Sequence, residues 1–449
     1  MSLTCGLECV VFIGFARWAW KRCTYVGSND SETWPIATPE EFEPVPRICR
    51  IILAVYETDL RKPQFPPEGG YQLNPDWVLK RVSYEQTEGR SPPYLIYLDH
   101  TFKEIVLAIR GLNLAKESDY KVLLNNRLGM QKFDGGYVHH GLLKSAIWLL
   151  NQESETLRKL WEENGREYSM VFAGHSLGSG VAALMALVAV NHRDKFGGIP
   201  RNNIRCYAVA PARCMSLNLA VKYADVINSI VLQDDFLPRT PTPLEDIFKS
   251  LFCLPCLLLL VCLRDTFIPE DRKLGDLRRL YAPGRMYHVV ERKFCRCGRF
   301  PPEVRTAIPV DERFEHIVLS MNATSDHGII WIERESEKAL RLMMESKPEP
   351  TVPPKVQKLE RLEKEHKDAL ERAVSLNIPF AASTSAKPSA NETLPEKEEK
   401  PSQAEGDDAP KTNLTSSSRS ENWDELVEKL FQRNDSGNLV LKQETDTQE

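Results

Sequence analysis

Apolar runs of strand length recur along the middle of the chain, and helix-like stretches separate several of them. Runs of this kind cover residues 94–98, 104–109, 168–173, 205–210, 226–233, 286–292 and 314–319. Strands that alternate with helices predict a mainly parallel sheet with helices on both faces, which is an α/β fold. The first two runs flank a turn at Asp99-His100, and this spacing predicts a hairpin that enters the sheet.

The stretch from Tyr168 to Val190 carries the strongest chemical signal. Between a strand that ends at Ala173 and a buried, alanine-rich helix lies the G-x-S-x-G sequence Gly174-His175-Ser176-Leu177-Gly178. At a strand-to-helix turn, the two glycines allow a tight bend that holds the serine strained with its hydroxyl exposed. We therefore predict that Ser176 is a nucleophile. The alternative is an ordinary glycine-flanked serine in a loop, and the flanking strand and helix argue against it.

A serine nucleophile needs a histidine base and a carboxylate that orients this base. In an alpha/beta-hydrolase fold the partners follow in the order serine, acid, histidine, each after a strand. The run 226–233 leads directly into two aspartates, Asp234 and Asp235. We choose Asp235 because its spacing to Pro238 agrees with a family motif named below. Asp234 could instead cap the loop or face solvent.

Four histidines follow the acid in the chain. His288 and His316 lie inside strand-like runs, and His366 lies in a charged segment near the end of the chain. His327 follows a polar loop and precedes a predicted helix that starts near Gly328. A loop after a strand is where the base of such a triad is found, so we predict that His327 is the base.

The oxyanion of the reaction needs two backbone donors. The amide of Leu177, at the start of the helix after the nucleophile, is one, and the helix dipole supports it. The loop after residues 104–109 offers the second donor at Leu112. The pair His139-His140 has no acidic or cysteine residue at ligand spacing, so we expect no catalytic metal and no other cofactor.

Composition narrows the class of partner. The chain has 449 residues, 42% of them hydrophobic, which allows a sizeable core. A net charge of -5 without a basic stripe gives no reason to expect a nucleic acid. The eleven cysteines are odd in number and unevenly spaced, so we predict reduced thiols in a cytoplasmic, cytosol-facing protein.

Two apolar segments predict peripheral contact with a membrane. Residues 10–13 are apolar, are followed by the basic and aromatic residues 17–22, and are too short for a bilayer span or a cleaved signal. An interfacial anchor fits, and a packed N-terminal helix is an equal alternative. S-acylation would suit three cysteines near this segment, Cys5, Cys9 and Cys23. It would equally suit three cysteines of the second segment, residues 251–263, namely Cys253, Cys256 and Cys262.

The second apolar segment, residues 251–263, follows a charged stretch and contains a proline. We predict a lid or cap that meets a membrane or lipid surface, and a buried helix is the alternative. The apolar side chains expected to make this contact are Leu251, Phe252, Leu257, Leu258, Leu259 and Leu260.

Composition also divides the chain into three parts. Residues 1–47 form an N-terminal membrane-proximal extension and linker, and residues 48–345 form the hydrolase domain with the lid insert at 244–280. Residues 346–449 contain a charged, helix-prone segment and a tail rich in Ser, Pro, Glu and Lys, which predicts disorder. A short amphipathic helix is expected at 423–431.

Five short motifs resemble the class 3 lipases, an alpha/beta-hydrolase family, over roughly residues 50–345. They are Ala108-Ile109-Arg110-Gly111, Val138-His139-His140-Gly141, Gly174-His175-Ser176-Leu177-Gly178, Asp235-Phe236-Leu237-Pro238-Arg239 and Ser325-Asp326-His327. Within the family the chain looks like the plant proteins related to sn-1-specific diacylglycerol lipases, some of them described as calmodulin-binding heat-shock proteins. The family's nucleophile, acid and base fall on Ser176, Asp235 and His327. Its oxyanion residue falls on Leu112, where many relatives carry Thr or Ser.

The resemblance implies a serine lipase that hydrolyses acyl esters of glycerolipids, with diacylglycerol or triacylglycerol as substrate. Calmodulin enters only through the resemblance. The candidate target helices are residues 13–26 and 332–347, each of which would equally suit a membrane-facing or packed helix. Two alternatives stay open. One is a catalytically weak or inactive hydrolase fold that acts as a calmodulin- or membrane-binding module, and the other is a soluble thioesterase or small-ester hydrolase.

Overall fold

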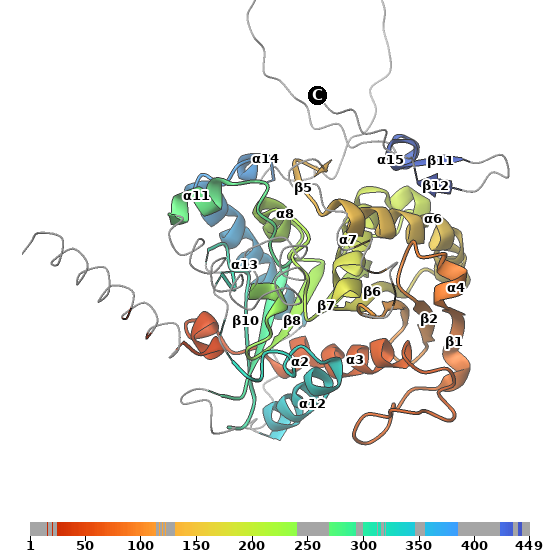
Figure 1. Ribbon diagram of the computed structural model, residues 1–449, viewed down its shortest axis with the longest axis horizontal. Helices are drawn as coiled ribbons and strands as arrows, with labels where there is room; N and C mark the ends of the chain where they lie inside the picture. The colour runs from red at the N-terminus through yellow and green to blue at the C-terminus, as the bar shows by residue number, and fades with distance from the viewer. Residues whose placement is uncertain are drawn as a thin grey trace, which may run out of the picture.

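An eight-stranded sheet forms the centre of the computed structural model (Figure 1). The structure describes residues 25–113, 131–239, 269–292, 300–311, 313–315, 320–345, 355–384, 423–433 and 439–441, and the single residues 16, 20, 116, 119, 122 and 318. In spatial order the strands are β1 (Val78–Val82), β2 (Tyr94–Asp99), β3 (Glu104–Ile109), β6 (Ser169–His175), β7 (Ile204–Val209), β8 (Ile227–Leu232), β9 (Arg285–Val290) and β10 (Glu303–Ala307).

The strands β3, β6, β7, β8 and β9 run parallel to one another, and the outer strands pair antiparallel. The predicted α/β fold with a mainly parallel sheet is therefore confirmed. The predicted hairpin is also confirmed, because Tyr94 of β2 lies opposite Ile109 of β3 and Asp99 lies opposite Glu104. The carboxyl ends of the parallel strands share one edge of the sheet, and the loops that follow β3, β6 and β8 meet there.

Helices cover both faces of the sheet (Figure 1). On one face lie α6 (His140–Glu163), α7 (Leu177–Asn191), α8 (Leu217–Lys222) and α13 (Lys355–Ser375). On the other face lie α2 (Pro39–Phe42), α3 (Pro44–Ala54) and α12 (Ile329–Glu345). Alternate residues of a strand point to opposite faces, so Leu107 packs under the first group of helices and Val106 under the second.

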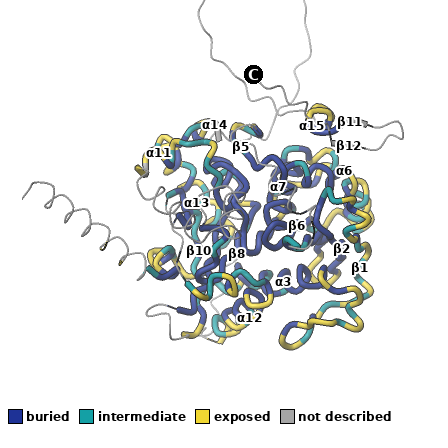
Figure 2. The backbone as a smooth tube through the Cα atoms, in the orientation of Figure 1, coloured by how far each residue is buried: buried dark blue, intermediate teal, exposed yellow. Residues whose placement is uncertain are grey.

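The helix α7, which follows the elbow, is buried on all sides. Every residue from Leu177 to Val190 is buried, and Figure 2 shows this helix and the central strands as the buried interior. The helix is apolar all round because it packs between the sheet and α6.

A buried ion-pair cluster joins α3 to α12. Arg50 of α3 donates to Glu333 over 2.7 Å and to Glu337 over 2.8 Å, both on α12. It also donates to Gln72 over 2.8 Å. Because α12 begins two residues after His327, this cluster helps to fix the loop that carries the predicted base.

One predicted strand is wrong. Among the described residues of the run 314–319, which are 314, 315 and 318, none belongs to a strand. Phe314 is apolar because its ring is fully buried against Trp34 and under the guanidinium of Arg239, and its backbone has a φ of 51°. The last strand of the sheet is β10 instead, and it pairs with β9.

The helices near the end of the chain pack on the same domain. Ala369 and Ala373 of α13 belong to the core that also contains α7. The short helix α15 (Trp423–Leu430) buries Trp423, Leu426 and Leu430, and the Trp423 ring meets His192 edge-on at 5.5 Å between centroids.

The smaller elements complete the described chain. They are η1 (Gly27–Ser31), η2 (Pro75–Trp77), α4 (Tyr84–Thr87), β4 (Lys132–Phe133), β5 (Gly136–Tyr137), η3 (Arg193–Phe196), η4 (Arg201–Asn203), η5 (Leu237–Arg239), α11 (Glu270–Gly275), α14 (Ala381–Thr384), β11 (Phe431–Arg433) and β12 (Leu439–Leu441).

The predicted contact surfaces for lipid fall largely outside the described residues. This holds for the six apolar lid residues between 251 and 260 and for all six cysteines proposed for acylation. Of the lid insert 244–280, the structure describes residues 269–280, which include α11. Among the described helices, none has the length and apolar character needed to cross a membrane.

Candidate active site

Ser176 lies at a sharp turn between β6 and α7. Its backbone has φ 54° and ψ -119°, a conformation that is rare for residues other than glycine. A Cβ atom on Gly174 would overlap the backbone of Gly178, and one on Gly178 would overlap the backbone of Arg110. The two glycines therefore allow the strand, the turn and the loop after β3 to pack closely around the serine.

The side chains of Ser176, His327 and Asp235 form one hydrogen-bonded chain. His327 Nε2 lies 2.8 Å from Ser176 Oγ, and His327 Nδ1 lies 2.9 Å from Asp235 Oδ1. Since a carboxylate only accepts, Nδ1 carries the proton and Nε2 is free to accept the serine proton. The structure thus brings together three residues that are 59 and 92 positions apart in sequence, in the geometry of a serine hydrolase.

The loop after β8 orients the carboxylate. Asp235 is fully buried, and its Oδ1 also accepts a hydrogen bond of 3.0 Å from the backbone amide of Leu237. The ring of Phe236 packs against the ring of His327 at 4.9 Å between centroids. The segment from Asp235 to Leu237 therefore fixes both the acid and one side of the base.

The residues that we set aside have other roles. Asp234 is buried, and its Oδ1 accepts a hydrogen bond of 2.9 Å from the amide of Gly27. His288 is fully buried in β9, where it lies 2.9 Å from the carbonyl of Gln233 and 2.7 Å from Ser31 Oγ. Burial lowers the pKa of His288 well below its usual value, so the ring is neutral. His366 lies 2.9 Å from the carbonyl of Val221, and His316 lies outside the described residues.

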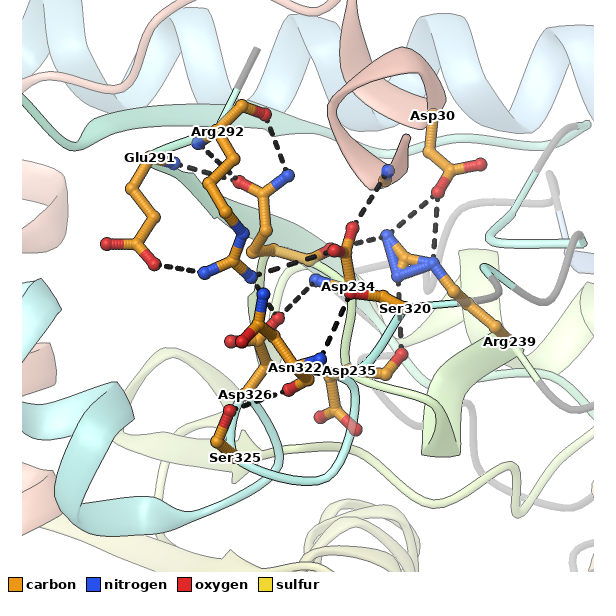
Figure 3. A network of polar contacts seen from close by, with 12 residues as sticks. Asp30, Asp234, Asp235, Arg239, Glu291, Arg292, Ser320, Asn322, Ser325 and Asp326 are labelled. Atoms are coloured by element: carbon orange, nitrogen blue, oxygen red, sulfur yellow. Dashed lines mark hydrogen bonds and ion pairs between the residues drawn. The ribbon is translucent and has the colours of Figure 1, made fainter. Parts of the chain in front are cut away.

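A buried network around Arg292 joins the acid loop to the base loop (Figure 3). Its guanidinium contacts Asp326 and Glu291 and lies 3.7 Å from Asp234. The amide of Asp234 donates a hydrogen bond of 3.0 Å to Asp326. Asp234 directly precedes the predicted acid and Asp326 directly precedes the predicted base, so one arginine ties the two loops together.

Burial raises the pKa of Asp326 to about 7, although the nearby charge of Arg292 opposes this rise. This network is not among the features predicted from the sequence. The signal available in the sequence was only the doublets Asp234-Asp235 and Asp326-His327 and the charged pair Glu291-Arg292 after a strand.

The N-terminal segment closes the other side of the acid loop. Asp30 pairs with the fully buried Arg239 over 2.8 Å, and Arg239 also donates to the carbonyl of Gln233 over 2.7 Å. Together with the hydrogen bond from Gly27 to Asp234, these contacts attach the first described turn, η1, to the loop that carries Asp235.

The two predicted oxyanion residues lie beside Ser176. Leu177 is the first residue of α7, directly after the serine. A Cβ atom on Gly111 would lie 3.2 Å from the Cβ of Ser176, so the backbone before Leu112 passes against the nucleophile. The Leu112 side chain is half-buried and packs against the main core.

The histidine pair 139–140 has a structural role in this fold. His139 is the N-cap of α6, and its Nδ1 accepts a hydrogen bond of 3.3 Å from the amide of Leu142. His140 Nδ1 lies 3.0 Å from Gln131 Oε1.

Two family models match the chain. The one described as Lipase (class 3) matches residues 106–245, and the one described as Lipase 3 N-terminal region matches residues 6–73. The first span contains Ser176 and Asp235 and the loop after β3.

The chain is also similar to curated proteins. It is 23% identical over 279 residues to diacylglycerol lipase-alpha of Rattus norvegicus, a match that covers 52% of this chain and 26% of that protein. It is 28% identical over 170 residues to diacylglycerol lipase-beta of Mus musculus, covering 35% of this chain and 23% of that protein. The chain thus spans about a quarter of the length of the curated relatives it matches.

Several solved lipases share weak similarity with the chain. A lipase from Rhizopus microsporus var. chinensis is 13% identical with a TM-score of 0.44, covering 66% of this chain and 89% of that one. A triacylglyceride lipase from Rhizomucor miehei is 14% identical with a TM-score of 0.39, covering 65% of this chain and 95% of that one.

Proposed function

Because the chain belongs to the class 3 lipase family, we propose that it is a serine hydrolase that cleaves acyl esters of glycerolipids. The observation that carries this proposal is the position of His327, within hydrogen-bond distance of both Ser176 and Asp235. A purely structural role does not require a strained serine that is hydrogen-bonded through an imidazole to a buried carboxylate.

The reaction follows from this geometry. Ser176 Oγ attacks the ester carbonyl while His327 Nε2 takes its proton, and the buried Asp235 stabilises the imidazolium that forms. The amides of Leu112 and Leu177 donate to the oxyanion of the tetrahedral intermediate. His327 then returns the proton to the leaving alcohol, and water releases the fatty acid from the acyl-enzyme by the same steps. Leu112 offers no side-chain hydroxyl, so its backbone amide is the group that must act.

We propose diacylglycerol or triacylglycerol as the substrate. The proposal is supported by the similarity to proteins named diacylglycerol lipases and by the apolar lid segment expected at 251–263. A substrate that is not dissolved in water requires an enzyme that reaches a lipid surface, so we also propose peripheral attachment to a membrane on its cytosolic side.

A fluorophosphonate probe tests the nucleophile. The wild-type protein should be labelled and its Ser176→Ala variant should not. Ser325→Ala is a matched control, because this exposed serine lies in the base loop and donates to the carbonyl of Asn322 rather than to His327 or Asp235. Equal labelling of wild type and Ser176→Ala would exclude Ser176 as the nucleophile. Product analysis on vesicles of mixed glycerolipids then identifies the ester that is cleaved.

Calmodulin binding stays a separate proposal. In the segment 332–347, Ile332 and Ala339 of α12 face the sheet and Glu333 pairs with the buried Arg50. A calmodulin that wraps this helix would have to pull it from the domain, so residues 13–26 are the better candidate. Binding of the full chain to calmodulin with calcium, but not with a calcium chelator, would support the proposal.

A further inference from the structure

A second histidine lies at the elbow, and the triad does not use it. His175 directly precedes Ser176 and is buried. Its ring lies 5.1 Å from the ring of His327, centroid to centroid, and its Nε2 lies 2.8 Å from the backbone carbonyl of His327. A carbonyl oxygen only accepts, so His175 Nε2 carries a proton and donates it to this carbonyl.

The other ring nitrogen faces a tyrosine. Tyr56 Oη lies 3.3 Å from His175 Nδ1, and the amide of Gly111 donates a hydrogen bond of 2.8 Å to the same oxygen. Burial lowers the pKa of His175 to about 3, so the ring is neutral and Nδ1 accepts. A tyrosine hydroxyl keeps its proton at neutral pH, so the partly exposed Tyr56 donates to Nδ1.

The three hydrogen bonds form a chain in which each group donates to the next. The Gly111 amide donates to Tyr56, Tyr56 donates to His175, and His175 donates to the carbonyl of His327. The chain starts at the backbone next to Leu112 and ends at the backbone of the base. It therefore connects the loop of the predicted oxyanion donor with the loop of the predicted base. Its middle member, His175, directly precedes Ser176 in the chain.

We propose that Tyr56 is a positioning residue, whose hydroxyl acts through His175 to hold the Gly111 and His327 backbones at fixed positions on either side of Ser176. The proposal rests on the proposed function and adds a residue to it. Tyr56 follows the end of α3, which itself is anchored to α12 by Arg50. The guanidinium of Arg110 lies over the Tyr56 ring, 4.6 Å from its centroid, and holds this ring in place.

The arrangement suits a reaction in which charge develops on both sides of the serine. The oxyanion forms near the Gly111–Leu112 backbone while positive charge forms on His327. A neutral His175 beside His327 adds no repulsion to that positive charge. Loss of the tyrosine hydroxyl would leave both backbone segments in place on average, but with fewer constraints on their separation.

The experiment compares Tyr56→Phe with wild type in hydrolysis of a soluble acyl ester and in the rate of fluorophosphonate labelling. The ring and its contact with Arg110 remain, and two hydrogen bonds are lost. We expect kcat and the labelling rate to fall together about tenfold, as loss of one or two such bonds implies, with little change in KM. Tyr97→Phe is the matched control, because its hydroxyl also accepts from a backbone amide, that of Asn74 at 3.1 Å, far from the site. Tyr97→Phe should leave kcat unchanged.

A double-mutant cycle separates positioning from general destabilisation. If Tyr56 acts through His175, then Tyr56→Phe should slow the His175→Gln variant much less than it slows wild type. Independent, multiplicative effects would overturn the proposal, as would a Tyr56→Phe variant with wild-type kcat. Melting temperatures of all variants show which of them are folded. Failure of the proposed function is distinguishable, because the wild type itself would then neither label nor turn over ester.

Discussion

Replacement of Arg292 by methionine should weaken the fold and the active site together. The side chain of Arg292 is 3% exposed and its guanidinium contacts Asp326 and Glu291, with Asp234 at 3.7 Å. Removing one partner from a buried ion pair typically destabilises a protein by about 3 to 5 kcal/mol, because charge is left without compensation. For a domain of about 300 residues that is a fall in melting temperature of about 5 to 8 °C.

The assay combines urea unfolding with the rate of fluorophosphonate labelling. Labelling of Arg292→Met should slow at least tenfold, because the loops of Asp235 and His327 lose the guanidinium that bridges them and keep the weaker link from the Asp234 amide to Asp326. Arg278→Met is the matched control, since Arg278 is exposed and, among the described residues, pairs with the neighbouring Asp276, so it should change stability by less than about 0.5 kcal/mol. Adding Asp326→Asn to Arg292→Met should recover part of the lost stability. A variant Arg292→Met that unfolds and labels like the wild type would refute the reasoning.

Three further predictions concern neighbouring groups. Because folding raises the pKa of Asp326 to about 7, its protonation adds to the free energy of unfolding at low pH, and this contribution is lost as the pH rises through 7. Urea unfolding at pH 5 and pH 8 should show a smaller change in the free energy of unfolding for Asp326→Asn than for wild type. An identical pH dependence in both proteins would contradict this prediction. Gly111→Ala should slow ester hydrolysis at least tenfold, because the new Cβ would lie 2.7 Å from His175 Nδ1 and 3.2 Å from the Cβ of Ser176. Gly27→Ala should lower the free energy of unfolding by about 1 to 3 kcal/mol, because its Cβ would lie 2.5 Å from Asp234 Oδ1. Gly275→Ala, which meets nothing within 4 Å, is the control for both glycine variants, and equal effects at all three positions would disprove these two steric arguments.

The features that sequence predicts well here are local ones. The central strands are buried on both faces, so they contain short continuous apolar runs such as residues 105–109 of β3 and 170–173 of β6. The strand, the glycine-flanked serine and the apolar helix stand next to one another in the chain, so the elbow at Ser176 needs no knowledge of distant contacts. Chain order and loop position then led to His327 and to the pair Asp234-Asp235, from which the spacing to Pro238 in the family motif selected Asp235. The structure places His327 within hydrogen-bond distance of both Asp235 and Ser176.

The features that sequence did not predict depend on burial or on distant partners. Strand β10 alternates buried and half-exposed residues and contains two apolar residues, Val304 and Ala307, so its pattern is weak. Phe314 is apolar because it fills a place beside Trp34, and that contact crosses most of the chain. Tyr56 meets His175 across 119 positions, and Arg292 meets Asp326 across 34, so neither contact leaves a periodic signal.

The backbone angle of Ser176 sets folding and reactivity in opposition at a single residue. At φ 54° an L-amino acid carries a conformational penalty of about 1 to 3 kcal/mol that glycine escapes. A glycine at this position would remove the strain and raise the stability of the protein, but it would also remove the nucleophile. The packing of the buried sheet and α7 must therefore supply enough stability to offset the strain at Ser176.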